Sequence, residues 1–419
     1  MRPPRALAWA RSSLVLPLVV GAAAYGVLGY NVGHPVGFAG DPSVFIHPGK
    51  PYLAPDLLPS GSFVEPVGSG YDGQFFFYMA QDPLLNGDAA RRDQTTSPHI
   101  DNVPYRYQRI LLPLAGWVTS WGDPDVLVWT MPLINLLSVL GAGYLLARFL
   151  ARRGHSPWLS LVYVLSLGVV VGVVNDLSDP LAASLFVAGV VWWIERRSTA
   201  AVVALALCLL AREVYLIPVA IICISELYRG GARAAKWVAP LGVWAAWQVY
   251  LRAALAASPT QTTHGPSPVP LLGTARKVKE LLRTDLIGSA NWELLFMATL
   301  LLTWVFFAVH SLQAADRVRH AGGRLGPREQ LLPIVALGAI LLIPFLTVAL
   351  WRYVPSYSRY SAPAAGLLVL AYAVRPGRAA LGLMVAVVAL SLANPIISLL
   401  PTRNAGKVIA AWVQPGGGA

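Results

Sequence analysis

The residues best suited to chemistry are concentrated in one polar stretch near the N-terminus. The stretch begins YDGQFFFYMAQDP at Tyr71 and ends PYRYQRILLPLAGW at Trp117. Asp72, with a usual carboxyl pKa of about 3.9, is ionised at neutral pH and could take a proton from a hydroxyl acceptor as a general base. The rings from Phe75 to Tyr78 could stack on a sugar. An Asp that caps a helix starting at Gly73 is the alternative that the residue types leave open.

Arginine, tyrosine and amide side chains in similar polar regions could bind a substrate. Arginine holds a phosphate through paired hydrogen bonds, but arginines and aromatic residues at helix ends also anchor ordinary membrane helices. We predict substrate or phosphate contacts from the YDGQ amide, from the residues before ILLPLAGW and from the segment WRYVPSYSRYSAP. These residues are Gln74, Tyr105, Arg106, Arg109, Arg352, Tyr357, Arg359 and Tyr360.

Charged residues also interrupt the apolar runs further along the chain. Asp176 and Asp179, in VVNDLSDP, mark a turn where they could contact an acceptor or a cation, or simply begin a helix. Arg212 and Glu213 lie midway through a long apolar run, and charged side chains inside a membrane segment normally face a cavity or a partner. Because adjacent helical residues point in different directions, we expect each of the two to pair with another group.

The composition places these residues in a membrane protein. Of the 419 residues, 56% are hydrophobic and 12% are charged, whereas soluble domains carry roughly 25% charged residues. The mean hydropathy is +0.58. The apolar residues form runs of about 17 to 25, each long enough to cross a hydrocarbon core of roughly 30 Å as a helix. These properties exclude a soluble globular chain.

We predict an all-α, polytopic fold in a single domain, residues 1–419, with about eleven spans. The first is Ser13 to Tyr30, and the run from Thr199 to Leu227 is long enough for two short spans that turn at Arg212 and Glu213. The others are Val126–Leu150, Trp158–Val174, Pro180–Ile194, Trp237–Leu255, Trp292–Ala314, Gln330–Leu350, Ala362–Val374 and Ala379–Leu400.

The charge distribution predicts which side of the membrane each loop faces. We place the N-terminus inside and treat residues 109–121 as a helix on the outer surface, because about 13 residues rise only ~20 Å. The inner segments ARFLARRGH, ERR, ELYRGGARAAK, DRVRHAGGRLGPRE and RPGR, with the N-terminus, then hold 17 of the 32 basic residues but 4 of the 20 acidic ones. This is a positive-inside pattern. Residues 31–121 and 257–290 become extracytoplasmic loops, the second with an interfacial helix, ARKVKELLRTDLIG.

Together these segments resemble the GT-C class of integral-membrane glycosyltransferases. The shared layout is one helix, a long outer loop with an early Asp before an aromatic-rich helix, the Pro-containing ILLPLAGW helix, a helix ending in ARR, an acidic outer turn and LLAREVY. It is most similar to mannosyltransferase-like and uncharacterised bacterial branches that carry YDGQ or WDGQ. The resemblance is clearest from Tyr71 to Ile224.

The resemblance implies a polyprenyl-phosphate sugar donor and hexosyl or pentosyl transfer, with inversion, at the extracytoplasmic face of a bacterial plasma membrane. The acceptor would be a glycan, lipid or protein of the cell envelope. In this class the acidic residue of the first loop is the catalytic base or a metal contact, and it maps onto Asp72. Many members carry an Asp-Asp or Asp-Glu pair where this chain has Asp72-Gly73, so the use of a divalent cation stays open.

Two other classes of function remain open from the residues. In a transporter or flippase, Arg212 and Glu213 would line a pathway through the membrane together with the outer acidic residues. A non-catalytic scaffold of a glycopolymer assembly complex would keep the fold without access to Asp72. The net charge of +12 follows the loops in a positive-inside pattern, so we predict no nucleic-acid partner.

Overall fold

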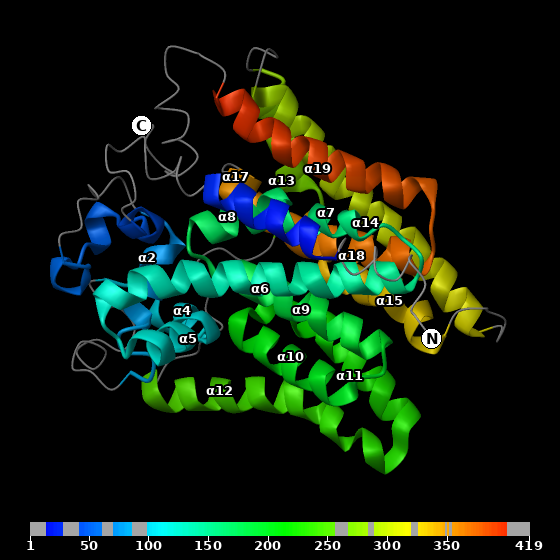
Figure 1. Ribbon diagram of the computed structural model, residues 1–419, viewed down its shortest axis with the longest axis horizontal. Coiled ribbons are helices and arrows are strands. Elements are labelled where there is room, and N and C mark those ends of the chain that lie inside the picture. Colours follow the sequence, from blue (N-terminus) through cyan, green and yellow to red (C-terminus); the bar gives the residue numbers. More distant parts are fainter. Residues whose placement is uncertain are drawn as a thin grey trace, which may run out of the picture.

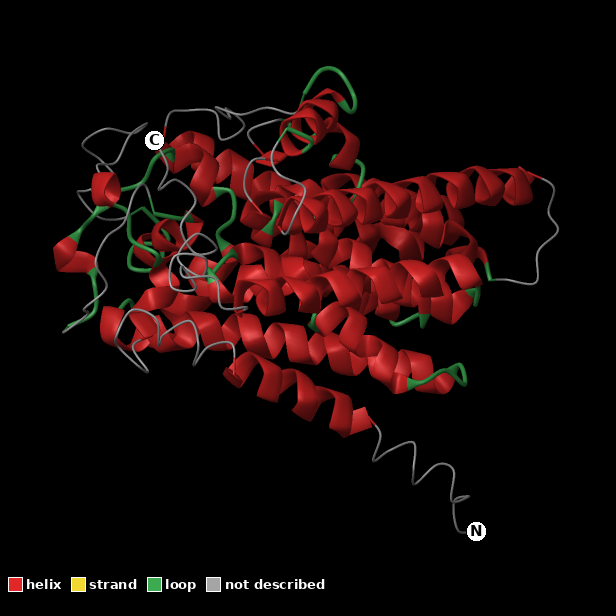
Figure 2. Ribbon diagram, turned by 90° about the horizontal axis from the view of Figure 1, so that it is seen from above, coloured by secondary structure: helices red, strands yellow, loops and turns green. Residues whose placement is uncertain are grey.

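The structure, a computed structural model, describes residues 14–27, 42–60, 70–85, 99–255, 267–283, 289–319, 326–347, 350–351 and 354–399. Over these residues it is helical and contains no β-strand, so the predicted all-α class is confirmed. Most of the long helices run side by side along the long axis of the molecule (Figures 1 and 2).

Three described segments are long and apolar enough to cross a membrane. They are α6 (Pro124–Arg152), most of α14 (Ser289–Arg319), and Pro327–Phe345, which contains α15 (Pro327–Ala339). A bent pair of helices would add a fourth. The other apolar helices are shorter: Leu14–Val27, Leu111–Ser120, Ser178–Ile194, Ser198–Ala211 and Arg378–Ala393. The chain therefore has helices suited to a membrane, and the number eleven stays a prediction.

The bent pair corrects the prediction of one continuous span at Trp158–Val174. After η4 (Pro157–Ser160), the chain forms α7 (Leu161–Val164) and α8 (Leu167–Val174), which meet at 53°. At the break, the amide of Leu167 donates to the hydroxyl of Ser391 at 2.9 Å, and the amide of Gly168 donates to the hydroxyl of Ser361 at 2.9 Å. These hydroxyls replace the carbonyl partners that a new helix start lacks.

The span predicted from Gln330 to Leu350 is matched in part by the segment Pro327–Phe345, which is not one continuous α-helix. The helix α15 ends at Ala339 and is followed by the short 3-10 helix η7 (Ile343–Phe345). Pro344 lies inside η7. Because proline lacks an amide hydrogen and its ring clashes with the carbonyl four residues earlier, it does not extend an α-helix that precedes it.

The predicted turn at Arg212 and Glu213 is confirmed. It separates α10 (Ser198–Ala211) from α11 (Leu216–Gly230) and contains the 3-10 helix η5 (Glu213–Tyr215). Gly189 allows α9 to approach α10, because a Cβ there would lie 2.8 Å from the Leu205 side chain. The remaining long helices are α9 (Ser178–Ile194), α12 (Ala239–Leu255, after η6, Gly231–Val238), α18 (Ser361–Val374) and α19 (Arg378–Leu399).

One end of the molecule carries the described parts of the first polar loop (Figure 1). It comprises α2 (Asp72–Met79), α4 (Val103–Tyr107), α5 (Leu111–Ser120) and three short 3-10 helices, Pro42–Ile46, Lys50–Tyr52 and Pro55–Leu57. Seven of the eight residues of α2 are buried, and Phe75 to Met79 share a second hydrophobic core with residues of α6 and α12. The ten residues of α5 rise only ~15 Å, which fits a helix that does not span.

The predicted interfacial helix exists in part, as α13 (Leu272–Leu281), but its charges are not all directed at headgroups. The side chain of Lys277 is 6% exposed, and its Nζ lies 3.2 Å from Glu293 Oε2 at the start of α14. Gly273 brings the helix against the backbone at Leu346, since a Cβ there would lie 2.0 Å from that carbonyl oxygen. The helix therefore packs on the protein through Lys277 and Gly273.

Candidate functional site

The carboxylate of Asp72 is the centre of the site and is held by two arginines from distant parts of the chain. Asp72 Oδ1 lies 2.9 Å from Arg106 Nη1, and Asp72 Oδ2 lies 2.9 Å from Arg359 Nη2. The side chain of Asp72 remains 17% exposed. The helix cap at α2 is Tyr71, without a side-chain cap bond, so the interpretation of Asp72 as a simple N-cap is wrong.

The residues around Asp72 fix α2 against its neighbours. A Cβ on Gly73 would lie 2.3 Å from the carbonyl oxygen of Asn175, so only glycine permits the contact. Gln74 is fully buried and accepts a hydrogen bond from the amide of Gly49 at 2.8 Å. Gly70 has a φ of +68°, which suits glycine. The YDGQ motif thus docks α2 on its neighbours, through the close approach at Gly73 and the hydrogen bond that Gln74 accepts from Gly49.

Arg106 lies on α4, and its guanidinium is held from two sides. Its Nε and Nη2 donate to both carboxylate oxygens of Asp101 at 2.8 and 2.7 Å. Its guanidinium carbon lies 4.4 Å from the centre of the Phe75 ring, within cation–π range. Asp101 was not among the predicted site residues. The only sequence signal for a role of Asp101 in the site was its position just before the helix, in DNVPYRY.

Arg109 forms the second ion pair of the site. Its Nε and Nη2 donate to the two oxygens of Glu213 at 3.0 and 2.7 Å, and Nη2 also donates to the hydroxyl of Tyr105. The side chain of Arg109 is 2% exposed. Separating this pair would leave the Arg109 charge buried without a partner, which is costly. The pair therefore holds the first polar loop against the turn between α10 and α11.

A third group of charges surrounds Asp179 at the start of α9. Arg212 Nη1 forms an ion pair with Asp179 Oδ2, and Arg359 Nη1 lies 3.8 Å from the same oxygen. Arg359 also donates to the hydroxyl of Tyr71 at 2.6 Å. Arg359 is thus shared between Asp179 and Asp72. The expectation that Arg212 and Glu213 pair with separate partners is confirmed.

Electrostatics keep Asp72 ionised. Burial alone would raise the pKa of Asp72, but the positive charges of Arg106 and Arg359 outweigh burial and hold it well below its usual range. The pKa of Glu213 is lowered to about 2, because the attraction of Arg109 exceeds the effect of burial. The ion pairs described above join four carboxylates to four arginines, so the cluster is close to neutral as it stands.

Asp176 lies beside α2 but outside this network. It is 1% exposed, has a φ of +51°, and accepts a hydrogen bond from Asn135 Nδ2 at 3.2 Å. Burial raises the pKa of Asp176 to about 8. The side chain is therefore mostly protonated at neutral pH and supports the turn on which Gly73 packs.

The predicted residues of the last polar turn separate into three groups. Arg359 belongs to the site. Tyr360 lies close to it: burial raises the pKa of the Tyr360 hydroxyl, and the nearby charges of Arg212 and Arg359 offset part of that rise. Tyr357 is fully buried and packs on Trp351 with ring centres 5.1 Å apart, so it is a core residue. Arg352 lies outside the described residues.

The aromatic run after Asp72 does not form the expected sugar platform. Phe75, Phe76 and Phe77 are at most 3% exposed, and Tyr78 is 4% exposed. They form the core under α2 instead, because all of them are apolar enough to be buried when the helix docks. Two rings of this segment still contact the arginines of the site: the Tyr71 hydroxyl binds Arg359, and the Phe75 ring packs on Arg106.

Within the part of the chain that the structure describes, no group of three or more His, Cys, Asp or Glu side chains is placed to hold a metal ion. The guanidinium of Arg359 lies between Asp72 and Asp179. A divalent cation bridging these two carboxylates would compete with that positive charge.

Searches with family models, among curated proteins and among solved structures find no match to this chain.

Proposed function

We propose that the chain is a membrane glycosyltransferase that moves a sugar from a polyprenyl-phosphate donor to a cell-envelope acceptor at the extracytoplasmic face. One observation carries the proposal: a partly exposed carboxylate, Asp72, stands among four mostly buried arginines at one end of a bundle of apolar helices. A carboxylate provides a base for a hydroxyl, and arginines provide the charge that a lipid phosphate needs.

The reaction assigns one role to each kind of group. The acceptor oxygen attacks the anomeric carbon, and its proton passes to a carboxylate oxygen of Asp72. The bond from the anomeric carbon to the phosphate oxygen breaks, and the lipid phosphate leaves with the electron pair. Its charge rises from about −1 to −2, and preorganised guanidinium groups stabilise such developing charge strongly.

The arginines of the resting site make Asp72 a weak base, because a low pKa favours the ionised form over proton uptake. A donor phosphate that draws Arg359 or Arg106 away would remove part of that positive field. Asp72 would then become more basic when a donor is bound and a proton must be taken up. This coupling is part of the proposal.

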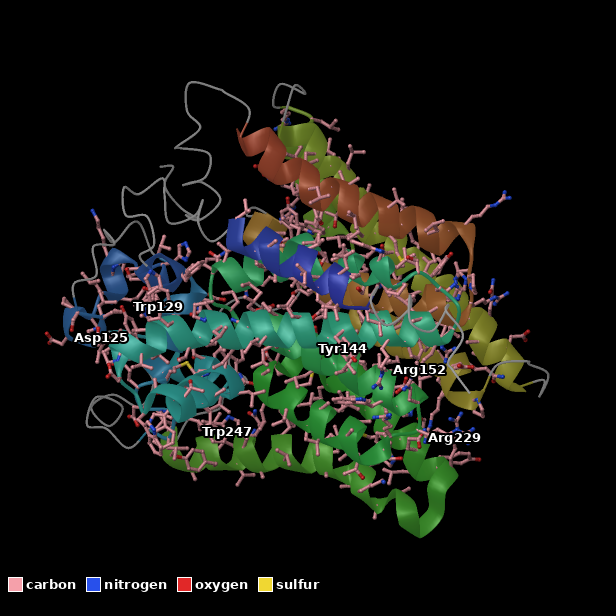
Figure 3. The ribbon with its side chains drawn as sticks, viewed as in Figure 1. Asp125, Trp129, Tyr144, Arg152, Arg229 and Trp247 are labelled. Carbon is pink, nitrogen blue, oxygen red and sulfur yellow. The ribbon has the colours of Figure 1, made fainter. Side chains whose placement is uncertain are left out.

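The distribution of charge along the molecule supports the orientation. The site lies at the end that carries Asp125, whereas Arg152 and Arg229 lie at the opposite end (Figure 3). Basic residues are retained on the cytoplasmic side of membrane proteins. We therefore assign the Asp72 end to the extracytoplasmic side, with a cytoplasmic N-terminus and about eleven spans in a bacterial plasma membrane.

A transporter is the less favoured alternative. At the end opposite the site, Arg153 Nη2 lies 2.6 Å from Glu329 Oε1, and Arg328 Nη2 lies 2.6 Å from Glu226 Oε2. The first pair joins α6 to α15, and the second joins α15 to α11. Pairs of this kind hold the helices together at the cytoplasmic end, where a transport pathway would have to open.

The donor class is tested by offering labelled sugars to membranes that contain the chain. Polyprenyl-phosphate sugars and nucleotide sugars are compared, and membranes lacking the chain provide the background. We expect transfer from a polyprenyl-phosphate sugar alone. Transfer directly from a nucleotide sugar in lipid-depleted, purified protein would contradict the proposed donor.

A further inference from the structure

The four arginines of the site differ in how many of their hydrogen-bond donors are already used. Arg106 makes two bonds to Asp101 and an ion pair with Asp72. Arg109 makes two bonds to Glu213 and one to a tyrosine hydroxyl. Because both guanidinium groups are bound in bidentate pairs, neither has its full fork of donors free for a ligand.

Arg212 and Arg359 retain unused donors. The Nε of each is buried and has no hydrogen-bond partner among the described residues, and Arg212 Nη1 approaches Asp179 without forming a well-directed hydrogen bond. Arg212 is 8% exposed as a residue. Buried donors without a protein partner are uncommon, so the two arginines have donors available for an incoming ligand.

The single carboxylate shared by these two arginines is Asp179. Its Oδ2 makes the ion pair with Arg212, lies 3.8 Å from Arg359 Nη1, and also has no hydrogen bond of good geometry. Asp179 therefore shares its single negative charge between two guanidinium groups without satisfying their donors. A phosphate offers more acceptor oxygens in the same space and binds guanidinium forks through paired bonds.

We infer that Arg212 and Arg359 form the subsite for the donor's phosphate, and that Asp179 is the counter-ion which this phosphate displaces. The inference rests on the proposed function for the identity of the ligand, a polyprenyl phosphate. It also narrows the arginines that bind the phosphate from four to two, because Arg106 and Arg109 then serve to hold Asp72 and the loop in place.

This assignment places the base and the leaving group beside one guanidinium group. Arg359 contacts Asp72 through Nη2 at 2.9 Å and keeps Nε free for the phosphate. As the bond to the anomeric carbon breaks, the growing phosphate charge is met by Arg359 and Arg212 together. Tyr360, near both arginines, adds a hydroxyl to the same region.

The test measures binding of decaprenyl phosphate to the purified full chain in detergent, with decaprenol as the phosphate-free control. Arg212→Gln is expected to weaken the phosphate-dependent part of binding by about tenfold to a hundredfold. Asp179→Asn is expected to strengthen it several-fold, because the competing negative charge is gone. Arg229→Gln, an exposed arginine at the opposite end, is the charge-matched control and should leave binding unchanged.

A gain of binding in Asp179→Asn cannot arise from misfolding, so the assignment remains testable if Arg212→Gln folds poorly. The subsite assignment is overturned if Asp179→Asn fails to bind more tightly, or if folded Arg212→Gln binds as well as the native chain. The expected binding pattern without any sugar transfer would retain the subsite and reject the glycosyltransferase. Transfer with binding insensitive to both changes would reject the subsite alone.

Discussion

At the scale of single residues, the site is a set of carboxylates whose partners decide their roles. Asp72 begins α2 and Asp176 lies in the turn against which α2 packs, yet arginines hold Asp72 ionised whereas burial raises the pKa of Asp176 to about 8. A role for Asp72, Arg106, Arg359 and Arg212 could be predicted from the sequence, since charged side chains in an apolar chain are costly and normally face a cavity or a partner. Which arginine meets which carboxylate could not, because the partners lie up to 287 residues apart.

Glu213 provides a prediction about pH. Its pKa is lowered in the folded state from 4.5 to about 2, so it contributes stability above pH 4.5 that is lost as the pH falls towards 2. We expect the thermal unfolding temperature of the native chain to fall steeply over this window. Glu213→Gln should flatten that acidic limb and lower the unfolding temperature at pH 7, because Arg109 is left buried without its partner.

The control for this measurement is Glu280→Gln, whose side chain is 52% exposed and lies 3.7 Å from Lys277 Nζ. It should leave both the unfolding temperature at pH 7 and the acidic limb unchanged within error. An acidic limb of equal slope in Glu213→Gln and the native chain would show that Glu213 does not carry this pH dependence.

At the scale of elements, the site depends on helices that start or end beside one another. The sequence predicts where helices occur, because apolar runs and the charges at Arg212 and Glu213 are local signals. It does not predict the break between α7 and α8, since the hydroxyls that stabilise it belong to Ser361 and Ser391. The docking role of Gln74 was missed for the same reason, because Gly49 becomes its neighbour only in the fold.

Gly73→Ala tests the docking of α2. The new Cβ would lie 2.3 Å from the carbonyl oxygen of Asn175, so the helix must move away from the turn. We expect a loss of about 1–3 kcal/mol of stability and a fall in sugar transfer, since Asp72 moves with the helix. Thermal unfolding and transfer rates are measured on the same membranes.

Gly141→Ala is the matched control, because it lies in α6 with nothing within 4 Å of the added Cβ. It should keep full activity and gain up to about 1 kcal/mol from the better helix propensity of alanine. A Gly73→Ala protein that is as stable and active as Gly141→Ala would rule out the proposed close contact.

At the scale of the whole molecule, the two ends differ in charge and in role. The Asp72 end holds the site, and the opposite end is closed by ion pairs among α6, α11 and α15. Composition alone was sufficient to predict a membrane protein, because no short-range detail is needed for that inference. The number of spans could not be established, since several apolar helices are only 10 to 17 residues long.

The orientation is tested by labelling single cysteines in intact cells with a membrane-impermeant maleimide. Asp125→Cys and Arg229→Cys mark the two ends of the molecule (Figure 3), and both positions are exposed. The native Cys208 and Cys223 are buried and are replaced by alanine. We expect labelling of Asp125→Cys in intact cells and of Arg229→Cys only after lysis; the reverse pattern would place the site in the cytoplasm.

The central claim is tested most directly by sugar transfer in membranes from labelled polyprenyl-phosphate sugars, comparing the native chain with Asp72→Asn. The amide keeps the size and much of the hydrogen bonding of the carboxylate but removes the base. At equal protein level we expect transfer to fall by at least about a hundredfold, whereas Asp125→Asn, the same change at an exposed position of the same end, retains it. Equal transfer in Asp72→Asn and the native chain would contradict the assignment of Asp72 as the catalytic base.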